Sequence, residues 1–211
     1  RYAALTFFLG IIFGCWALAL QGWFLILLWL SLCLFALSIG YARPGTNIFF
    51  KRSDGTIPFP SKVIYLPFFL YSHLIWHLLR WLSRERSFDQ TANNLLLGRR
   101  LLAFELPDGI HNYLDLTMEF EDPVQVRERF NYICLPILNG GIPKPESLLA
   151  AFQRLEEGPI YIHCARGHGR TALAALCLLG WRKDLDSFDE GLKRLKKSRP
   201  GIHLNRDQSE F

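Results

Sequence analysis

The sequence predicts an α/β fold: a central, mostly parallel sheet flanked by helices, preceded by an N-terminal transmembrane helical hairpin and an interfacial helix. Two long uncharged apolar runs open the chain, and short apolar segments alternate with amphipathic ones from residue 88 onward. Charge divides the chain in the same way. Seven Lys and Arg against two acidic residues give residues 43–87 a net charge of +5, whereas residues 88–211 carry sixteen against seventeen, a net of −1. We therefore predict three parts: a hairpin at 1–42, a basic juxtamembrane segment at 43–87 and a folded domain at 88–211.

The hairpin is predicted from length and composition. Residues 2–20 and 23–42 are uncharged, and each run is long enough to cross a hydrocarbon core of about 30 Å. A cleaved signal peptide would explain one such run, but two runs separated only by Gln21 and Gly22 favour a hairpin. No Lys or Arg lies between the runs, whereas Arg43 follows the second. The positive-inside rule therefore predicts an integral membrane protein whose folded domain is cytoplasmic.

Residues 63–82 form a third apolar stretch, interrupted by Pro67. A third span would move the folded domain to the other side of the membrane. We predict instead a helix that lies in the interface, because aromatic and basic side chains are typical of headgroup depth. The side chains expected there are Tyr71, Trp76, Trp81, Arg80, Arg84 and Arg86. His73 and His77 are one helical turn apart and could hold a metal, but no third ligand is evident, so polar positions on this helix are the favoured interpretation.

The partners follow from where the positive charge lies. A basic cluster directly after an apolar hairpin suits anionic lipid headgroups. A nucleic-acid-binding protein would instead carry a basic face on its folded domain. We predict membrane lipids as partners and no nucleic acid. The five cysteines show no CxxC pair and no metal-ligand spacing, which indicates a reducing compartment.

The elements of the folded domain are predicted from apolar periodicity and capping residues. An N-cap at Asp122 with Pro123 at the first helical position predicts a helix there, and Ser187 with Glu190 forms a capping box. Predicted strands are 94–97, 101–104, 113–116, 132–135 and 160–162, and the further predicted helices are 145–157, 171–181 and 188–197.

The segment 160–171, IYIHCARGHGRT, combines a buried strand, a short loop and the start of a helix. A helix N-terminus supplies free N–H groups and partial positive charge, which suits a phosphate group. Gly167 and Gly169 allow the backbone to turn and approach closely. The planar fork of Arg170 can hold two phosphate oxygens. The same positive field lowers the pKa of the Cys164 thiol and makes it a nucleophile.

This pattern resembles the signature of the protein tyrosine phosphatase superfamily, in its dual-specificity branch: His-Cys, five residues, Arg, then Thr. The resemblance covers roughly residues 88–211 and includes Leu97-Gly98-Arg99-Arg100, Leu114-Asp115-Leu116-Thr117 and Arg199-Pro200. It implies the cysteine-phosphatase fold, with a cysteinyl-phosphate intermediate on Cys164 and neither metal nor another cofactor. It further implies a phosphate cradle made by Ala165, Arg166, Gly167, His168, Gly169 and Arg170. Thr171 would assist the thiolate, and His163 would brace the loop.

One position departs from the family pattern. The family has an aspartate, as general acid, on a loop before the signature, and this chain has Asn139 there. An amide cannot give up a proton in its place, and losing a general acid costs about 10²–10⁴ in rate. Asp115, Glu119 or Glu121 could serve instead, the enzyme could be slow, or the asparagine could be an introduced change that keeps binding.

Two substrate classes follow from the resemblance. A phospholipid headgroup, such as phosphatidylglycerophosphate or a phosphoinositide, suits the predicted tether and the charge of Arg166 and His168. The segment Met118-Glu119-Phe120-Glu121 is similar to an acidic-aromatic element of phosphatidylglycerophosphate-type lipid phosphatases. A phosphotyrosine or dual-specificity protein phosphatase is the alternative, and Asn139 keeps a non-catalytic phosphate-binding module open.

Overall fold

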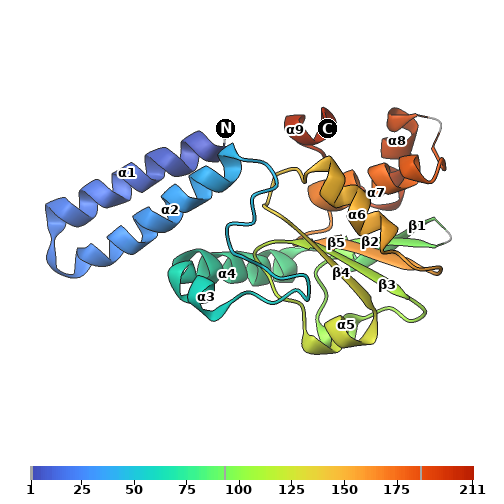
Figure 1. Ribbon diagram of the computed structural model, residues 1–211, viewed down its shortest axis with the longest axis horizontal. Helices are drawn as coiled ribbons and strands as arrows, with labels where there is room; N and C mark the ends of the chain where they lie inside the picture. Colours follow the sequence, from blue (N-terminus) through green and yellow to red (C-terminus); the bar gives the residue numbers. More distant parts are fainter. Residues whose placement is uncertain (1, 93, 186) are drawn as a thin grey trace.

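The computed structural model describes residues 2–92, 94–185 and 187–211, so residue 1 of the predicted hairpin lies outside the described residues. The chain forms a sheet domain from which two sets of apolar helices project on one side (Figure 1). One set is the hairpin of α1 (Tyr2–Leu20) and α2 (Ile26–Ala42), joined by a short 3-10 turn at Gly22–Leu25. The other is the helix pair α3 (Phe59–Ile64) and α4 (Leu66–Leu82).

The hairpin satisfies its own polar groups. Ser31 Oγ donates to the Gly10 carbonyl at 2.7 Å, and Ser38 Oγ donates to the Ala3 carbonyl at 2.8 Å. Small and hydroxyl residues at a helix contact are typical of helices that pair in lipid. Both helices, the second taken with its preceding turn, are long and apolar enough to cross a membrane by length and composition. Their outward side chains, such as Phe8, Leu18 and Leu32, are exposed.

The sheet confirms the predicted α/β class. It has the order β1-β2-β5-β3-β4, in which β1 pairs antiparallel with β2 and the remaining neighbours are parallel. The strands are β1 (Phe88–Ala92), β2 (Leu95–Arg99), β3 (Asn112–Thr117), β4 (Asn131–Ile137) and β5 (Ile160–Cys164). The helices around it are α5 (Val124–Arg129), α6 (Pro145–Gln153), α7 (Gly169–Trp181), α8 (Phe188–Ser198) and α9 (Arg206–Ser209). The main core lies between the sheet and α6 and α7, and most residues of α7 are buried.

Several local predictions need correction. Residues 101–104 are not a strand: a 3-10 turn occupies Ala103–Glu105, and the edge strand is β1, whose largely polar sequence hid it. Asp122 is not a helix cap, because Pro123 holds the N-cap position without a side-chain bond. The helix predicted at 145–157 ends at Gln153. Ser187 does cap α8, accepting a hydrogen bond from the Glu190 amide at 3.2 Å.

The segment between the hairpin and α3 is docked into the sheet domain. Asn47 closes it into a loop by bonding both the amide and the carbonyl of Lys51. The Lys51 side chain is fully buried, and its Nζ lies 2.5 Å from Asp115 Oδ2 and 2.7 Å from the Thr117 carbonyl, both on β3. The sheet domain therefore includes contacts from a part of the chain that we predicted to be a separate juxtamembrane segment.

Candidate active site

The loop 164–170 joins the carboxyl end of β5 to the N-terminus of α7. Gly167 has a φ of +73°, and a side chain there would collide with the backbone of Gly98 at the end of β2. Only glycine combines that conformation with that approach. The loop amides are thus held at the N-terminus of a 13-residue helix, where free N–H groups and the helix dipole favour an anion.

Cys164 lies at the start of this loop and is buried. Its Sγ accepts a hydrogen bond from the Gly167 amide at 3.2 Å. Burial tends to raise the pKa of the thiol, but the charge of Arg170, the Thr171 hydroxyl and the loop amides more than offset it, so the pKa is lowered. The Thr171 hydroxyl is buried and has no other hydrogen-bond partner among the described residues, which leaves its proton available to the sulfur. A lowered pKa increases the fraction of thiolate, which is the nucleophilic form of cysteine.

Arg170 is held in place by Glu119. The two side chains form a bidentate pair, with Nη2 to Oε1 at 2.7 Å and Nη1 to Oε2 at 2.9 Å. Nη1 also donates to the Ile137 carbonyl at 2.7 Å. The Arg170 Nε is buried without a partner among the described residues, so one donor of the fork remains for a bound oxyanion.

Behind the loop, His163 belongs to a buried network of charged groups. Its Nε2 lies 3.1 Å from Asp122 Oδ2 and 3.5 Å from Asp115 Oδ1. Burial opposes its charge, but the two carboxylates outweigh burial and raise the pKa of His163. Asp115, Asp122 and His163 could by distance hold a metal ion. However, Lys51 already pairs with Asp115, and Arg100 lies 3.4 Å from Asp122, so both carboxylates are neutralised by cations of the chain.

The outer side of the loop is braced by Arg199. It donates to the carbonyls of Gly167 at 2.9 Å and Arg166 at 3.1 Å, and it pairs with Asp89 at 2.7 Å. His168 lies 2.8 Å from Glu85. Burial lowers the pKa of His168 despite that carboxylate. A lowered pKa favours the neutral imidazole, contrary to the expectation that His168 adds positive charge to the loop, and Arg166 is exposed.

Trp76 of α4 also contacts the loop. Its Nε1 donates to the Ala165 carbonyl at 2.9 Å, and the Arg100 guanidinium lies 5.2 Å from its ring centroid. Only 4% of Trp76 is exposed. The Trp76 side chain therefore packs against the sheet domain and does not face headgroups as expected, whereas Tyr71 and Trp81 on the same helix are exposed.

Asn139 lies at the exposed tip of a tight turn, closed by a 2.8 Å bond from the Gly141 amide to the Leu138 carbonyl. Its neighbours are tied to the C-terminal segment: Asn205 Nδ2 donates to the Gly140 carbonyl at 2.7 Å, and Gln208 Nε2 to that of Gly141 at 3.2 Å. Gln208 also packs against Gly169. The turn is therefore anchored beside the 164–170 loop.

The three carboxylates considered as substitutes for an aspartate at this position are all engaged. Asp115 is fully buried, and Lys51 and the Tyr132 hydroxyl occupy its Oδ2. Burial would raise its pKa, but Lys51 and His163 hold the pKa well below its usual range. Glu119 orients Arg170, and Glu121 accepts from the Ile57 amide and from Lys62.

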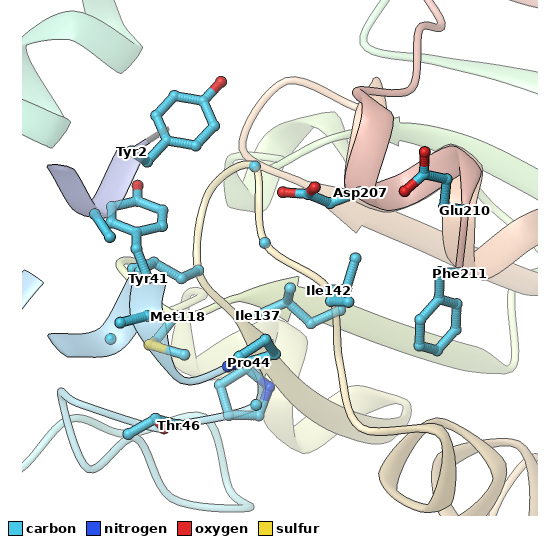
Figure 2. Close-up of a pocket in the computed structure, with 18 residues that line it drawn as sticks. Tyr2, Tyr41, Pro44, Thr46, Met118, Ile137, Ile142, Asp207, Glu210 and Phe211 are labelled. Carbon is cyan, nitrogen blue, oxygen red and sulfur yellow. The ribbon is translucent and has the colours of Figure 1, made fainter. Parts of the chain in front are cut away.

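A cavity of about 590 Å³ lies between the base of the hairpin and the Asn139 turn (Figure 2). Tyr2 and Tyr41 line it from the hairpin, Gly140 and Ile142 from the turn, and α9 contributes Asp207. It connects the hairpin surface with the loop that carries position 139.

Sequence reasoning found Cys164 and Arg170 but not the residues that hold them. The sequence predicts Glu119 as a candidate proton donor and Arg199-Pro200 as a family-like segment. The structure shows instead that Glu119 pairs with Arg170 and that Arg199 binds the loop carbonyls. Nothing in the sequence marks Lys51 as buried.

Comparison with solved structures shows the fold of the tyrosine and dual-specificity phosphatases, as the signature predicted. Tk-PTP in its active form is 22% identical, with a TM-score of 0.52 over 59% of this chain and 92% of that one. PTPMT1 in complex with PI(5)P is 17% identical, with a TM-score of 0.51 over 59% and 91%. The human tyrosine phosphatase-like serine/threonine/tyrosine-interacting protein is 16% identical, with a TM-score of 0.52 over 60% and 93%.

Among curated sequences, the chain is 37% identical over 82 residues to Putative tyrosine phosphatase 067L of Invertebrate iridescent virus 3. That match covers 34% of this chain, and the chain spans about a third (34%) of the length of that relative. No family model matches the chain.

Proposed function

We propose that this chain is a membrane-tethered phosphatase that hydrolyses phosphate monoesters through a cysteinyl-phosphate intermediate. The observation that carries the proposal is the Cys164 thiol of lowered pKa inside a loop of amides beside an Arg170 that Glu119 orients. The Cys164 thiolate attacks phosphorus, and the ester oxygen departs with the electron pair of the P–O bond. Water then attacks the phosphorus, the S–P bond breaks with its electron pair returning to the Cys164 sulfur, and inorganic phosphate is released. Arg170 and the loop amides stabilise the charge on the phosphoryl oxygens in both steps.

The substrate class that we propose is a phospholipid with a phosphate monoester in its headgroup, such as phosphatidylglycerophosphate or a phosphoinositide. Two helices that could span a membrane support a tether, and a tether raises the effective concentration of substrates in the same bilayer. A cavity at the base of the hairpin, between Tyr41 and the Asn139 turn, lies on the side from which such a lipid would approach, although no residue of 164–170 lines it. A similar fold is known with PI(5)P bound. By the positive-inside rule, the domain would face the cytoplasm.

A second candidate is a phosphate-binding module that reads phosphorylated partners without turnover. The observation that favours it is Asn139, and one of the similar structures is a phosphatase-like interacting protein. Activity on a phosphoprotein is a further alternative, since the 164–170 loop recognises a phosphate group whatever carries it.

Phosphate release by the full chain in detergent separates these candidates. The substrates are an aryl phosphate, a phosphotyrosine peptide, phosphatidylglycerophosphate and PI(5)P, with Cys164→Ser as the inactive control. We expect release from at least one lipid with a lower KM than for the peptide, because the asparagine at position 139 slows alkyl leaving groups more than the phenolic one and kcat would carry that difference. Preference for the peptide would make the chain a protein phosphatase. No release from any compound, with tungstate still bound, would establish the binding module and refute the proposed activity.

A further inference from the structure

The helix pair α3–α4 exposes many apolar side chains, with Lys62 of α3 and His73 and His77 of α4 exposed beside them. No Asp, Glu, Lys or Arg occurs between residues 63 and 79. Soluble proteins rarely expose apolar patches of this extent. The exposed side chains are Phe59, Val63, Ile64, Leu66, Leu70, Tyr71, Leu74, Leu78, Trp81 and Leu82.

The helix pair α3–α4 packs against the hairpin. α3 and α4 project from the sheet domain on the same side as α1 and α2 (Figure 1). Tyr65 and Phe69 pack with Cys33 and Leu37 of α2 in one buried cluster. The exposed apolar side chains of α2 and of α4 therefore belong to helices that pack directly on each other.

At the break between α3 and α4, the Ile64 carbonyl receives its hydrogen-bond donors from α2, as a free carbonyl inside a membrane requires. The Ile64 carbonyl accepts a hydrogen bond from Trp29 Nε1 at 2.6 Å and contacts Cys33 Sγ at 3.1 Å, both on α2. A broken helix that faced water would need no such donors. In hydrocarbon, an unpaired carbonyl costs several kcal/mol, and neighbouring helices supply its partner.

The contact also fixes how deep the break lies. Cys33 precedes the end of α2 at Ala42 by about 13 Å at 1.5 Å per residue. Half of a hydrocarbon core is about 15 Å. If the hairpin spans the bilayer with Ala42 at its surface, the α3–α4 break lies deep in the leaflet and α4 rises from there toward the surface. The long Lys62 side chain of α3 reaches back toward the surface, where it pairs with Glu121 of the sheet domain at 2.8 Å.

We propose that α3–α4 is a wedge inserted into the same leaflet as the base of the hairpin, with the lipid bilayer covering its apolar surface. This differs from a helix lying flat in the interface, and it rests on the membrane anchorage proposed above. The far half of α4 carries Trp76, which bonds the Ala165 carbonyl. The wedge thereby fixes the height of the 164–170 loop above the bilayer and selects phosphates that lie at headgroup level.

Depth-dependent quenching tests the wedge without relying on turnover. The background chain carries Cys15→Ala, Cys177→Ala and Cys164→Ser, which leaves only two buried cysteines. Single cysteines at Leu70→Cys and Trp81→Cys on α4 receive an environment-sensitive fluorophore. Leu74→Cys is a second probe of the same surface. Leu32→Cys on α2 is the membrane reference, and Phe188→Cys on α8 is the aqueous control; all five positions are exposed.

The labelled chains are reconstituted into phosphatidylcholine–phosphatidylglycerol vesicles containing nitroxide lipids with the spin label at the headgroup or deep in the acyl chain. We expect deep nitroxides to quench the Leu70 probe best and headgroup nitroxides to quench the Trp81 probe best. The two probes are about 16 Å apart along the helix.

Each other result overturns the wedge. Equal quenching of both α4 probes at one shallow depth means a flat interfacial helix. No lipid quenching on α4, with energy transfer between labelled copies, means that the surface is a dimer interface. In both cases a quenched Leu32 probe leaves the membrane anchorage standing. An unquenched Leu32 probe removes the anchorage itself.

Discussion

At the scale of single residues, the site has the groups that activate the nucleophile but no carboxylic acid at the general-acid position. Cys164, Arg170 and the loop amides are all in place, but position 139 offers an amide at the tip of an anchored turn. Every carboxylate that we considered as a replacement already has a partner. Neither Asn139 nor the carboxylates of Asp115, Glu119 and Glu121 are therefore available to protonate the leaving-group oxygen.

Replacing Asn139 by aspartate tests whether position 139 is the site of proton transfer. We expect Asn139→Asp to raise kcat on alkyl phosphates, including lipid phosphates, by about 10²–10⁴ because these leaving groups need protonation. An aryl phosphate has a good leaving group, so its kcat should change little. Phosphate release from both substrates measures the difference. An equal effect on both, or no effect on either, would show that position 139 takes no part in proton transfer.

A second prediction concerns how the rate of Cys164 alkylation depends on pH. The folded-state pKa of Cys164 is lowered, so its alkylation by iodoacetamide should reach half its maximum rate below the pH typical of a free thiol. Removing the Thr171 hydroxyl with Thr171→Ala removes one interaction that favours the anion, and the midpoint should move to higher pH. Mass spectrometry of the peptide containing Cys164 follows the reaction, with Cys177 as the internal reference because burial raises the pKa of its thiol. An unchanged midpoint would mean that Thr171 does not act on the sulfur.

At the scale of elements, the segment after the hairpin is part of the sheet domain. Lys51 lies under β3, in contact with Asp115 and the Thr117 carbonyl. Asp115 in turn lies beside His163, the residue before the nucleophile. The segment that follows the hairpin and the 164–170 loop are therefore joined by a short series of buried polar contacts.

Substituting this lysine should be costly. Lys51→Met leaves Asp115 buried without its cation, and breaking such a pair costs about 3–5 kcal/mol. Lys62→Met is a matched control, since the Lys62 side chain is 45% exposed in its pair with Glu121 and an exposed pair is worth about 0–1 kcal/mol. Urea unfolding in detergent, followed by Trp fluorescence, gives both values.

The pair also has a pH signature. Asp115 has a depressed pKa, so its stabilisation is present above the ordinary pKa of a carboxyl and is lost as pH falls below that range. If Lys51→Met cost no more than Lys62→Met, the buried pair would not stabilise the fold. Adding Asp115→Leu to Lys51→Met should recover part of the loss, because the uncompensated charge is then gone.

At the scale of the whole molecule, groups that lie close together in the sequence could be predicted to act together, whereas contacts between distant residues could not. The nucleophile, the glycines and Arg170 lie within one short segment, so a local pattern was enough to find them and the fold class. Glu119 meets Arg170 across 51 positions, and Lys51 meets Asp115 across 64. Such contacts depend on the strand order β1-β2-β5-β3-β4, which local periodicity does not encode. Asp122 was misread for the same reason: its proximity to proline suggested a cap, whereas its partners come from β5 and from Arg100.

The last prediction concerns the tether and the substrate together. A phosphatase anchored by the hairpin reaches lipids of its own bilayer, where its effective concentration is high, and hardly reaches lipids of another vesicle. We expect the reconstituted chain to dephosphorylate a lipid phosphate in its own vesicles at least tenfold faster than the same lipid in separate vesicles. A soluble aryl phosphate should react at one rate in both mixtures, which controls for the amount of active protein. Equal rates on the two lipid pools would mean that the 164–170 loop works away from the membrane. A soluble phosphopeptide would then be the more suitable substrate, since it needs no shared bilayer.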